Sequence, residues 1–477
     1  MGLDLTTIAI FVAFGIIYML IIPPQWRQWS LFLASIILIF SLQPNIFVRW
    51  MDFILPMLTL GLTVMSWAIT HDTEYRISRQ DILAGLLIIG AMVLLAMLRY
   101  IDADWRWFIP SRPPPTLLVL MLIFIFGFLA VTLPRLSSSL SIFLLVMIGI
   151  FLVLKTDFLA ETVSAWWRNG TGQDVSQASS LDLNWLGFSY VAFRLIHTIR
   201  DRQSGILPTL SLRDYISYVL FFPSFIAGPI DRAERFIGDF KNLTETIQFS
   251  ERYQRGLTRI AIGIGKKFVI ADTLAQGMAL NPQNAMQIDS AFGAWLLLYG
   301  YALRLYFDFS GYSDIAIGIG ILFGIDLPEN FANPYMKTSI TKFWQSWHIT
   351  LSNWVRFYVF SPLSRYLLKR KPKPSPILIV LITQLATMIV IGLWHGVTVN
   401  FLIWGIWHGI GLWVHKQWTD RTRKFYRDFK QKPQQQMIAD VIAWGITFHF
   451  VVLGWVWFAL PDLDSALRMF ASLFGLS

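Results

Sequence analysis

The chain has 477 residues, of which 55% are hydrophobic and only 14% are charged. A soluble domain carries about one-quarter charged residues, so this composition excludes an ordinary soluble protein and indicates one that lies in a membrane. Cysteine is absent, which excludes disulfides, thiolate metal sites and a cysteine-bound acyl intermediate on this chain. The net charge of +10 falls in loops between apolar stretches, where positive-inside topology explains it better than nucleic-acid binding.

Apolar stretches long enough, or nearly long enough, to cross a membrane recur along the chain. They occupy 7–22, 53–70, 82–98, 116–133, 137–154, 376–394 and 441–460. With the shorter candidates between them we expect about eleven spans in an all-α, polytopic transmembrane bundle, with room for amphipathic and re-entrant helices. The first stretch has no basic leader and no small-residue cleavage site, so we expect it to remain as a span.

The N-terminal third is predicted to be a scaffold. Residues 1–154 are expected to form simple, lipid-facing helices with almost no buried polar chemistry. From 155 to 275 the pattern turns to mixed apolar and charged segments, and Trp166, Trp167 and Arg168 followed by a polar run through Ser180 indicate an amphipathic surface helix and a long loop.

Two basic loops predict the orientation of the C-terminal part. The block 365–373 carries five Lys/Arg and no acid, and the block 416–432 carries seven against Asp420 and Asp428. Both are expected in the cytoplasm. Residues 376–414 are then a hairpin that leaves the cytoplasm and returns, and 416–477 form a basic cytoplasmic loop followed by a last span.

Histidines in apolar sequence are the main candidates for chemistry. His348 lies in FWQSWHITLS (343–352), His395 lies in GLWHGVTVN (392–400), and His408 repeats the Trp-His-Gly triplet. A buried imidazole is neutral and can take a proton from a hydroxyl near neutral pH. The alternative is a hydrogen-bonded packing histidine beside a glycine that lets helices approach closely.

His408 is predicted to be the weakest of the three candidates. It follows His395 by 13 residues, which on one continuous helix separates the two by about 220° and about 20 Å. They share a site only if the segment breaks.

Two further groups of polar residues lie in apolar surroundings. Asp308 and Asp314 are read as lining a substrate tunnel or, equally, as structural hydrogen-bonding groups; about 240° apart on a helix, they do not form an acid–base dyad. Arg194, His197 and Asp201 share one helical face, which predicts a salt-bridged helix end or a site for an anionic donor. We find no phosphate loop, paired-histidine metal motif or nucleophile elbow.

Four motifs together resemble the membrane-bound O-acyltransferase (MBOAT) family: YFDFSGYSDIAIG (306–318), DLPENFANPY (326–335), FWQSWHITLS and GLWHG. The resemblance covers roughly 185–415 and implies an MBOAT fold with its catalytic core there. It implies that His395 is the catalytic centre and His348 the second histidine. No metal site is predicted, because the sequence lacks a metal-binding motif. The remaining candidates for the substrate tunnel are Asp308, Asp314, Trp347, Trp394, Asn330 and His408.

The resemblance leaves the substrate open. Residues 306–335 are most similar to alginate O-acetyltransferase and related exopolysaccharide acetylation proteins, whereas FRLIHTIRD and FFPSFIAGPIDR (221–232) resemble the D-alanyl transfer protein of teichoic acid synthesis. The chain also departs from the family pattern: Ser346 stands where an arginine is frequent, and Arg356-Phe357-Tyr358 stands in place of Arg-Asp-Tyr.

The implied function is acyl transfer, with acetyl favoured, by a multi-pass protein of the inner (plasma) membrane. The donor would be a cytoplasmic thioester, acetyl-CoA or an acyl carrier protein, with no tightly bound cofactor. The acceptor would be a hydroxyl of an extracytoplasmic polysaccharide, wall polymer or partner protein, with an extracytoplasmic acyltransferase as partner. The alternatives are D-alanyl transfer to teichoic acid, a transporter that uses the histidines as proton relays, and a membrane anchor without chemistry.

Overall fold

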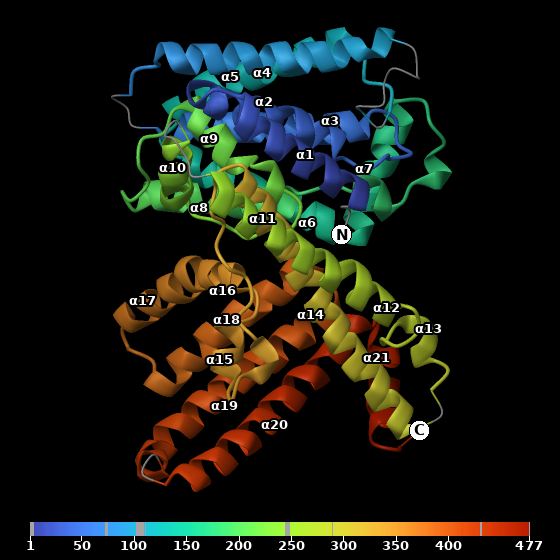
Figure 1. Ribbon diagram of the computed structural model, residues 1–477, viewed down its shortest axis with the longest axis vertical. Helices are drawn as coiled ribbons and strands as arrows, with labels where there is room; N and C mark the ends of the chain where they lie inside the picture. The colour runs from blue at the N-terminus through green and yellow to red at the C-terminus, as the bar shows by residue number, and fades with distance from the viewer. Residues whose placement is uncertain are drawn as a thin grey trace. The chain divides into compact units, whose positions relative to one another are not determined.

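The computed structural model describes residues 4–71, 75–101, 109, 111–243, 249–288, 290–429 and 432–476. Within these residues the chain is helical, and an isolated antiparallel bridge joins Phe331 to Trp347. The predicted all-α class is confirmed (Figure 1).

The chain divides into two compact units, and the long helices α11 and α14 contribute to both. The first unit comprises residues 1–260 and 316–328. Its helices are α1 (Leu5–Ile21), α2 (Pro24–Ser41), α3 (Met51–Thr70), α4 (Arg79–Met97), α5 (Thr116–Thr132), α6 (Ser139–Lys155), α7 (Asp157–Gly170), α8 (Phe188–Gln203), α9 (Leu212–Val219), α10 (Ala233–Asn242) and most of α11 (Phe249–Ile264), with short 3₁₀ turns η1 (Leu98–Tyr100), η3 (Leu133–Arg135), η4 (Val175–Gln177), η5 (Ser180–Leu183) and η6 (Phe222–Ser224).

The second unit comprises residues 261–315 and 329–477. It contains the π-helical segment η7 (Gly265–Ala271), α12 (Asp272–Ala275), α13 (Pro282–Ala285), most of α14 (Ala291–Leu322), the 3₁₀ turn η8 (Pro334–Met336), α15 (Ile340–Trp344), α16 (Ile349–Val355), the π-helical η9 (Arg356–Phe360), α17 (Ser361–Lys369), α18 (Pro376–His395), α19 (Val399–Phe429), α20 (Pro433–Ala459) and α21 (Leu463–Leu473). The assignment of a catalytic core to 185–415 stays a prediction.

Five helical segments in the described residues are long and apolar enough to cross a membrane: 51–70, 79–100, 116–135, 376–395 and 433–459. A sixth span results if α6 and α7, which meet at a bend of 94°, are counted as one. The helix α1 is apolar but shorter. All seven predicted stretches are helical, whereas the predicted count of about eleven spans is not confirmed.

The prediction that residues 1–154 carry almost no buried polar chemistry is wrong for α3 and α4. In α3, 78% of the best 18-residue window is buried inside the protein. Thr59 accepts a hydrogen bond of 2.7 Å from the indole of Trp185, and Ser66 bonds the hydroxyl of Tyr215 at 2.7 Å. Asp81 caps α4 and also accepts from the backbone N–H of Leu212. Polar groups on these helices hold later segments of the chain, since a buried polar atom must be paired.

The predicted amphipathic helix and long loop correspond to α7 and residues 171–187. Trp166 is exposed on α7, while Ser164 and Arg168 on its other face are buried. Both buried groups bond the carboxylate of Asp182, at 2.6 Å and 2.9 Å. This charge-assisted contact fastens the loop to the helix.

In the second unit, α18 and α19 form the predicted hairpin and lie side by side (Figure 1). Glycines allow the close approach: a Cβ on Gly392 would lie 2.3 Å from the carbonyl oxygen of Phe401, and one on Gly405 would lie 2.7 Å from that of Met388. The packing is that of small residues in membrane helices. It also explains the glycine three residues before His395.

Candidate active site

His348 is held by a short antiparallel pairing between two segments without regular helix. The Phe331–Trp347 bridge joins them, the N–H of Ala332 donates to the carbonyl of Ser346 at 3.0 Å, and the N–H of Ile349 donates to that of Asn330 at 2.9 Å. His348 itself precedes α16 with φ of 43°. A left-handed backbone costs a non-glycine residue about 1–3 kcal/mol. The pairing on both sides keeps His348 in this conformation.

Asn330 determines which ring nitrogen of His348 carries the proton. Its Oδ1 accepts hydrogen bonds from the backbone N–H and hydroxyl of Thr350, at 3.3 Å and 2.6 Å. A backbone N–H can only donate, so the side-chain atom of Asn330 that bonds the N–H of Thr350 is the amide oxygen and not the amide nitrogen. The same Oδ1 lies 3.4 Å from Nδ1 of His348, and Nδ1 must therefore be the donor. Nε2 is left with a lone pair.

The Nε2 atom of His348 is buried and has no hydrogen-bond partner in the described structure. The residue is 3% exposed, and burial lowers its pKa to about 3. The imidazole therefore stays neutral at physiological pH. It can accept a hydrogen bond from a substrate hydroxyl, but it is a poor acceptor of a full proton.

His395 is the last residue of α18 and is partly buried. Its ring lies 4.5 Å from that of Trp394, 4.7 Å from Phe458 and 5.8 Å from Trp404, between ring centroids. The negative end of a helix dipole favours a cation in the last turn. The C-terminal end of α18 would therefore stabilise a positive charge on His395.

The three candidate histidines belong to one aromatic cluster within the second unit. The ring of Trp394 contacts both His348, at 6.1 Å, and His395. Trp404 contacts both His395 and His408, the latter at 4.9 Å. The helix breaks at 396–398, so the angular and axial separations expected for one continuous helix do not apply. His408 is 0% exposed and packs between Trp344 and Trp404. Its buried position fits the packing alternative, but neither ring nitrogen has a hydrogen-bond partner in the described residues, so the hydrogen bond of that alternative is not found.

The remaining tunnel candidates have structural partners. Trp347 is buried among Phe331, Phe343 and Trp455. Asp308 and Asp314 on α14 bind two consecutive lysines: Lys267 Nζ lies 2.5 Å from Asp308, and Lys266 Nζ lies 2.6 Å from Asp314. The π-helical turn at 265–271 widens the spacing of side chains, as such turns do. The tunnel itself stays a prediction.

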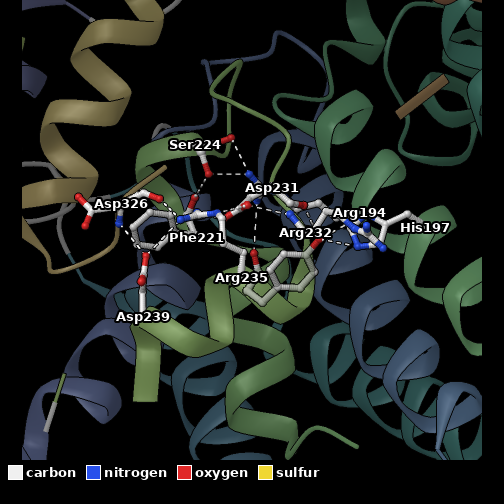
Figure 2. Close-up of polar contacts among 10 residues, drawn as sticks. Arg194, His197, Phe221, Ser224, Asp231, Arg232, Arg235, Asp239 and Asp326 are labelled. Carbon is white, nitrogen blue, oxygen red and sulfur yellow. Dashed lines mark hydrogen bonds and ion pairs between the residues drawn. The ribbon is translucent and has the colours of Figure 1, made fainter. Parts of the chain in front are cut away.

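The predicted face of Arg194, His197 and Asp201 forms part of a polar network in the first unit, which Figure 2 shows running from Arg194 and His197 to Asp239 and Asp326. Arg194 is 1% exposed and donates to the carbonyls of Val219 and Ser224 at 2.7 Å and 3.0 Å. Asp201 pairs with Arg232 at 3.4 Å. The Asp201–Arg232 pair fits the alternative of a salt-bridged helix end. Arg194 instead holds the 219–224 turn through its carbonyls.

The network continues into the DLPENFANPY motif. Arg235 on α10 bonds Asp231 and the backbone carbonyl of Asp326, and Asp239 accepts from the N–H of Asp326 at 2.9 Å (Figure 2). Arg252 on α11 adds an ion pair to Asp326 at 2.9 Å. The segment after α14 is therefore fixed at its start by arginines before it continues toward Asn330.

The sequence comparison agrees with this arrangement. Residues 133–454 match the profile of the membrane-bound O-acyltransferase family. The chain belongs to this family. The matched region includes all four motifs and both histidines of the predicted centre. With several apolar helices long enough to cross a membrane in its described residues, this member of the family is a multi-pass membrane protein.

The names of three similar proteins refer to three different polymers, namely alginate, peptidoglycan and teichoic acid. The chain is 37% identical over 291 residues to a probable alginate O-acetylase of Pseudomonas putida, covering 61% of this chain and 55% of that protein. It is 38% identical over 264 residues to a peptidoglycan O-acetyltransferase of Helicobacter pylori, covering 55% and 47%. It is 31% identical over 283 residues to a teichoic acid D-alanyltransferase of Bacillus subtilis, covering 58% and 69%. The chain spans about half the length of the first two.

The structure places residues around the candidate histidines that the sequence did not indicate. Trp404 and Phe458 complete the surroundings of His395. Asn400, which lies inside the quoted GLWHGVTVN motif, donates to the carbonyls of Leu460 and Asp462 at 2.9 Å each and so ties the start of α19 to the end of α20. The sequence feature that could have indicated this role is the presence of an asparagine in an otherwise apolar helix start.

Proposed function

We propose that this protein is an O-acyltransferase whose catalytic centre is His395, assisted by His348. The observation that carries the proposal is the setting of His348: its buried Nε2 has no hydrogen-bond partner among the described residues, and its ring belongs to the cluster that also contains His395. Membership of the MBOAT family and the O-acetyltransferase names of its relatives support the same reaction.

The reaction follows from the different surroundings of the two histidines. His348 Nε2 accepts a hydrogen bond from the acceptor hydroxyl and orients its oxygen. His395 takes the hydroxyl proton as the oxygen attacks the thioester carbonyl, and the positive charge is stabilised by the C-terminal end of α18. The new C–O bond forms, the C–S bond breaks, and the thiolate leaves with the proton that His395 returns. A thioester is already activated, so orientation and exclusion of water supply much of the acceleration.

The finer assignment is an acetyl group that passes from a cytoplasmic thioester, acetyl-CoA or an acyl carrier protein, to an extracytoplasmic polysaccharide or partner protein. The site would lie in the inner (plasma) membrane and would need no tightly bound cofactor. Two relatives with O-acetylase or O-acetyltransferase names at 37–38% identity favour acetyl. In this proposal the acceptor comes from outside the cytoplasm. An extracytoplasmic acyltransferase that supplies or takes over the acyl group is therefore part of the same proposal.

D-alanyl transfer to teichoic acid is the second candidate. It is favoured by the relative in Bacillus subtilis, 69% of whose length is matched. A proton-relay transporter is less consistent with the geometry, because the described ring contacts join the histidines through Trp394 and Trp404. An indole N–H donates but has no lone pair to accept a proton.

The test uses purified protein, radiolabelled acetyl-CoA and extracytoplasmic fractions that contain acceptor and partner proteins. Wild type is compared with His395→Ala, His348→Ala and the control His449→Ala, whose exposed histidine on α20 bonds Tyr299. We expect label in an alkali-labile ester for wild type and control, and none above background for His395→Ala. Full transfer by His395→Ala would overturn its role. Transfer only from a D-alanyl carrier protein would select the teichoic-acid branch.

A further inference from the structure

A groove in the second unit lies apart from the residues proposed for catalysis. It has a volume of about 1350 Å³ and is lined by α19, α20 and the segment before and at the start of α15. Two apolar rows face it, each with a spacing of four residues: Ile410, Val414 and Trp418 on α19, and Ile442, Ile446 and Phe450 on α20. Residues four apart lie on one helix face, so each row is a continuous apolar strip.

One end of the groove is basic. Arg423 and Lys424 line it there, together with the hydroxyls of Thr419 and Thr422. Lys342 lines the groove from α15, next to Thr341, which contacts His415 of α19. Asp440 is the single acid among the described residues that line the groove. The Nζ of Lys342 donates to the neutral hydroxyl of Thr338 at 3.3 Å, so this contact leaves its charge uncompensated. The local balance of three cations against one acid favours an anionic ligand.

The dimensions match one leaflet of a bilayer. From Ile410 to Trp418 the apolar row on α19 extends about 12 Å, and the hydrocarbon of one leaflet is about 15 Å thick. Trp418 ends the apolar row on α19 and precedes the cations of that helix, at the position that tryptophans take at the membrane interface. The cations begin five residues beyond it, within the block predicted to be cytoplasmic.

We propose that this groove binds an anionic phospholipid of the cytoplasmic leaflet. Its acyl chain lies between the two apolar rows, and its phosphate contacts Arg423 and Lys424. The charge complementarity and the ordered sequence of apolar row, tryptophan and cations carry the assignment. A transmembrane helix of a partner would use the apolar rows but would leave the cations without a counter-charge.

The probe is a phosphatidylglycerol with a photoreactive acyl chain, in nanodiscs that hold the full-length protein, compared with a phosphatidylcholine of identical chains. Crosslinks are mapped by peptide mass spectrometry. We expect crosslinks to 410–424 and 439–450 with phosphatidylglycerol in excess over phosphatidylcholine. Each cation near a lipid headgroup favours binding several-fold, so Arg423→Gln with Lys424→Gln lowers the crosslinking by at least about tenfold.

The matched control is Arg365→Gln with Lys369→Gln on α17. These exposed residues carry the same charge as Arg423 and Lys424 but lie outside the groove. A second variant, Ala443→Trp, fills the groove without a change of charge and is expected to abolish the crosslinks. Equal labelling by both lipids, or equal loss in the α17 control, would overturn the proposal. Displacement by soluble coenzyme A would instead assign the groove to a nucleotide-bearing donor and also contradict it.

Discussion

Oδ1 of Asn330 lies 3.4 Å from Nδ1 of His348 and at the same time accepts two hydrogen bonds from Thr350. This relationship fixes the proton of the imidazole on Nδ1 and leaves Nε2 as the free acceptor. In the proposed reaction Asn330 would therefore be a positioning residue that acts through His348.

Asn330→Ala is expected to lower the rate of acyl transfer by about 10–100-fold, as loss of an orienting partner of a histidine does. Asn330→Asp keeps an acceptor for Nδ1–H and is expected to restore part of the rate. Thr350→Val serves as control because it removes a bond to Asn330 but not the contact to His348. Rates are measured at matched folded amounts. An Asn330→Ala enzyme as fast as wild type would rule out the positioning role.

The acid limb of the pH–rate profile is not expected to belong to His348. Burial lowers the pKa of His348 to about 3, so this ring does not titrate between pH 5 and 8. His348→Gln should therefore lower the rate but leave the midpoint of the acid limb in place. The profile of kcat/KM for both proteins decides the matter, since a midpoint that moves with the substitution would make His348 the titrating base.

The α18–α19 hairpin is expected to tolerate no side chain at Gly392. A Cβ there would lie 2.3 Å from the carbonyl oxygen of Phe401, so Gly392→Ala must separate the helices and displace His395. We expect a destabilisation of about 1–3 kcal/mol and a loss of transfer. Gly90→Ala is the matched control, because a Cβ at Gly90 has no atom within 4 Å. Thermal unfolding in detergent is the measurement, and equal behaviour of the two variants would contradict the prediction.

The ion pair of Lys267 and Asp308 is expected to stabilise the protein more than the exposed pair of Lys416 and Asp420. The side chain of Lys267 is 8% exposed, whereas that of Lys416 is 48% exposed. Lys267→Ala leaves the partly buried Asp308 without its counter-charge and should cost about 1–3 kcal/mol. Lys416→Ala should cost less than about 0.5 kcal/mol. If the unfolding midpoints of Lys267→Ala and Lys416→Ala fall by the same amount, burial does not strengthen the contribution of the Lys267–Asp308 pair to stability.

His197 is expected to make folding stability depend on pH. Burial, with Arg232 and Arg194 adding repulsion, lowers its pKa to about 3. Below about pH 6.5 the imidazole of His197 binds a proton in the unfolded chain but not in the folded chain. The free energy of unfolding therefore falls by up to about 1.4 kcal/mol for each pH unit between about pH 6.5 and about pH 3. His197→Gln lacks this loss. The difference in melting temperature between wild type and variant should shrink from pH 7.5 to 4.5, whereas parallel curves would refute the assignment.

The sequence by itself determined the class of protein, the helical stretches and the motifs that carry His348 and His395. Those features follow from local chemistry, since apolar length and motif composition can be read along one chain. It also predicted the hairpin of 376–414 and the alternative roles of Asp308 and Asp314.

Only the tertiary structure decided which distant groups meet. The pairing of Asn330 with His348, the break at 396–398 that brings His395 and His408 to a common Trp404, and the burial of α3 all depend on contacts between segments far apart in sequence. Periodicity within one helix gives angles and rises along that helix alone. The partner of a polar atom is settled by packing, because a buried donor or acceptor must find its bond wherever the fold supplies one.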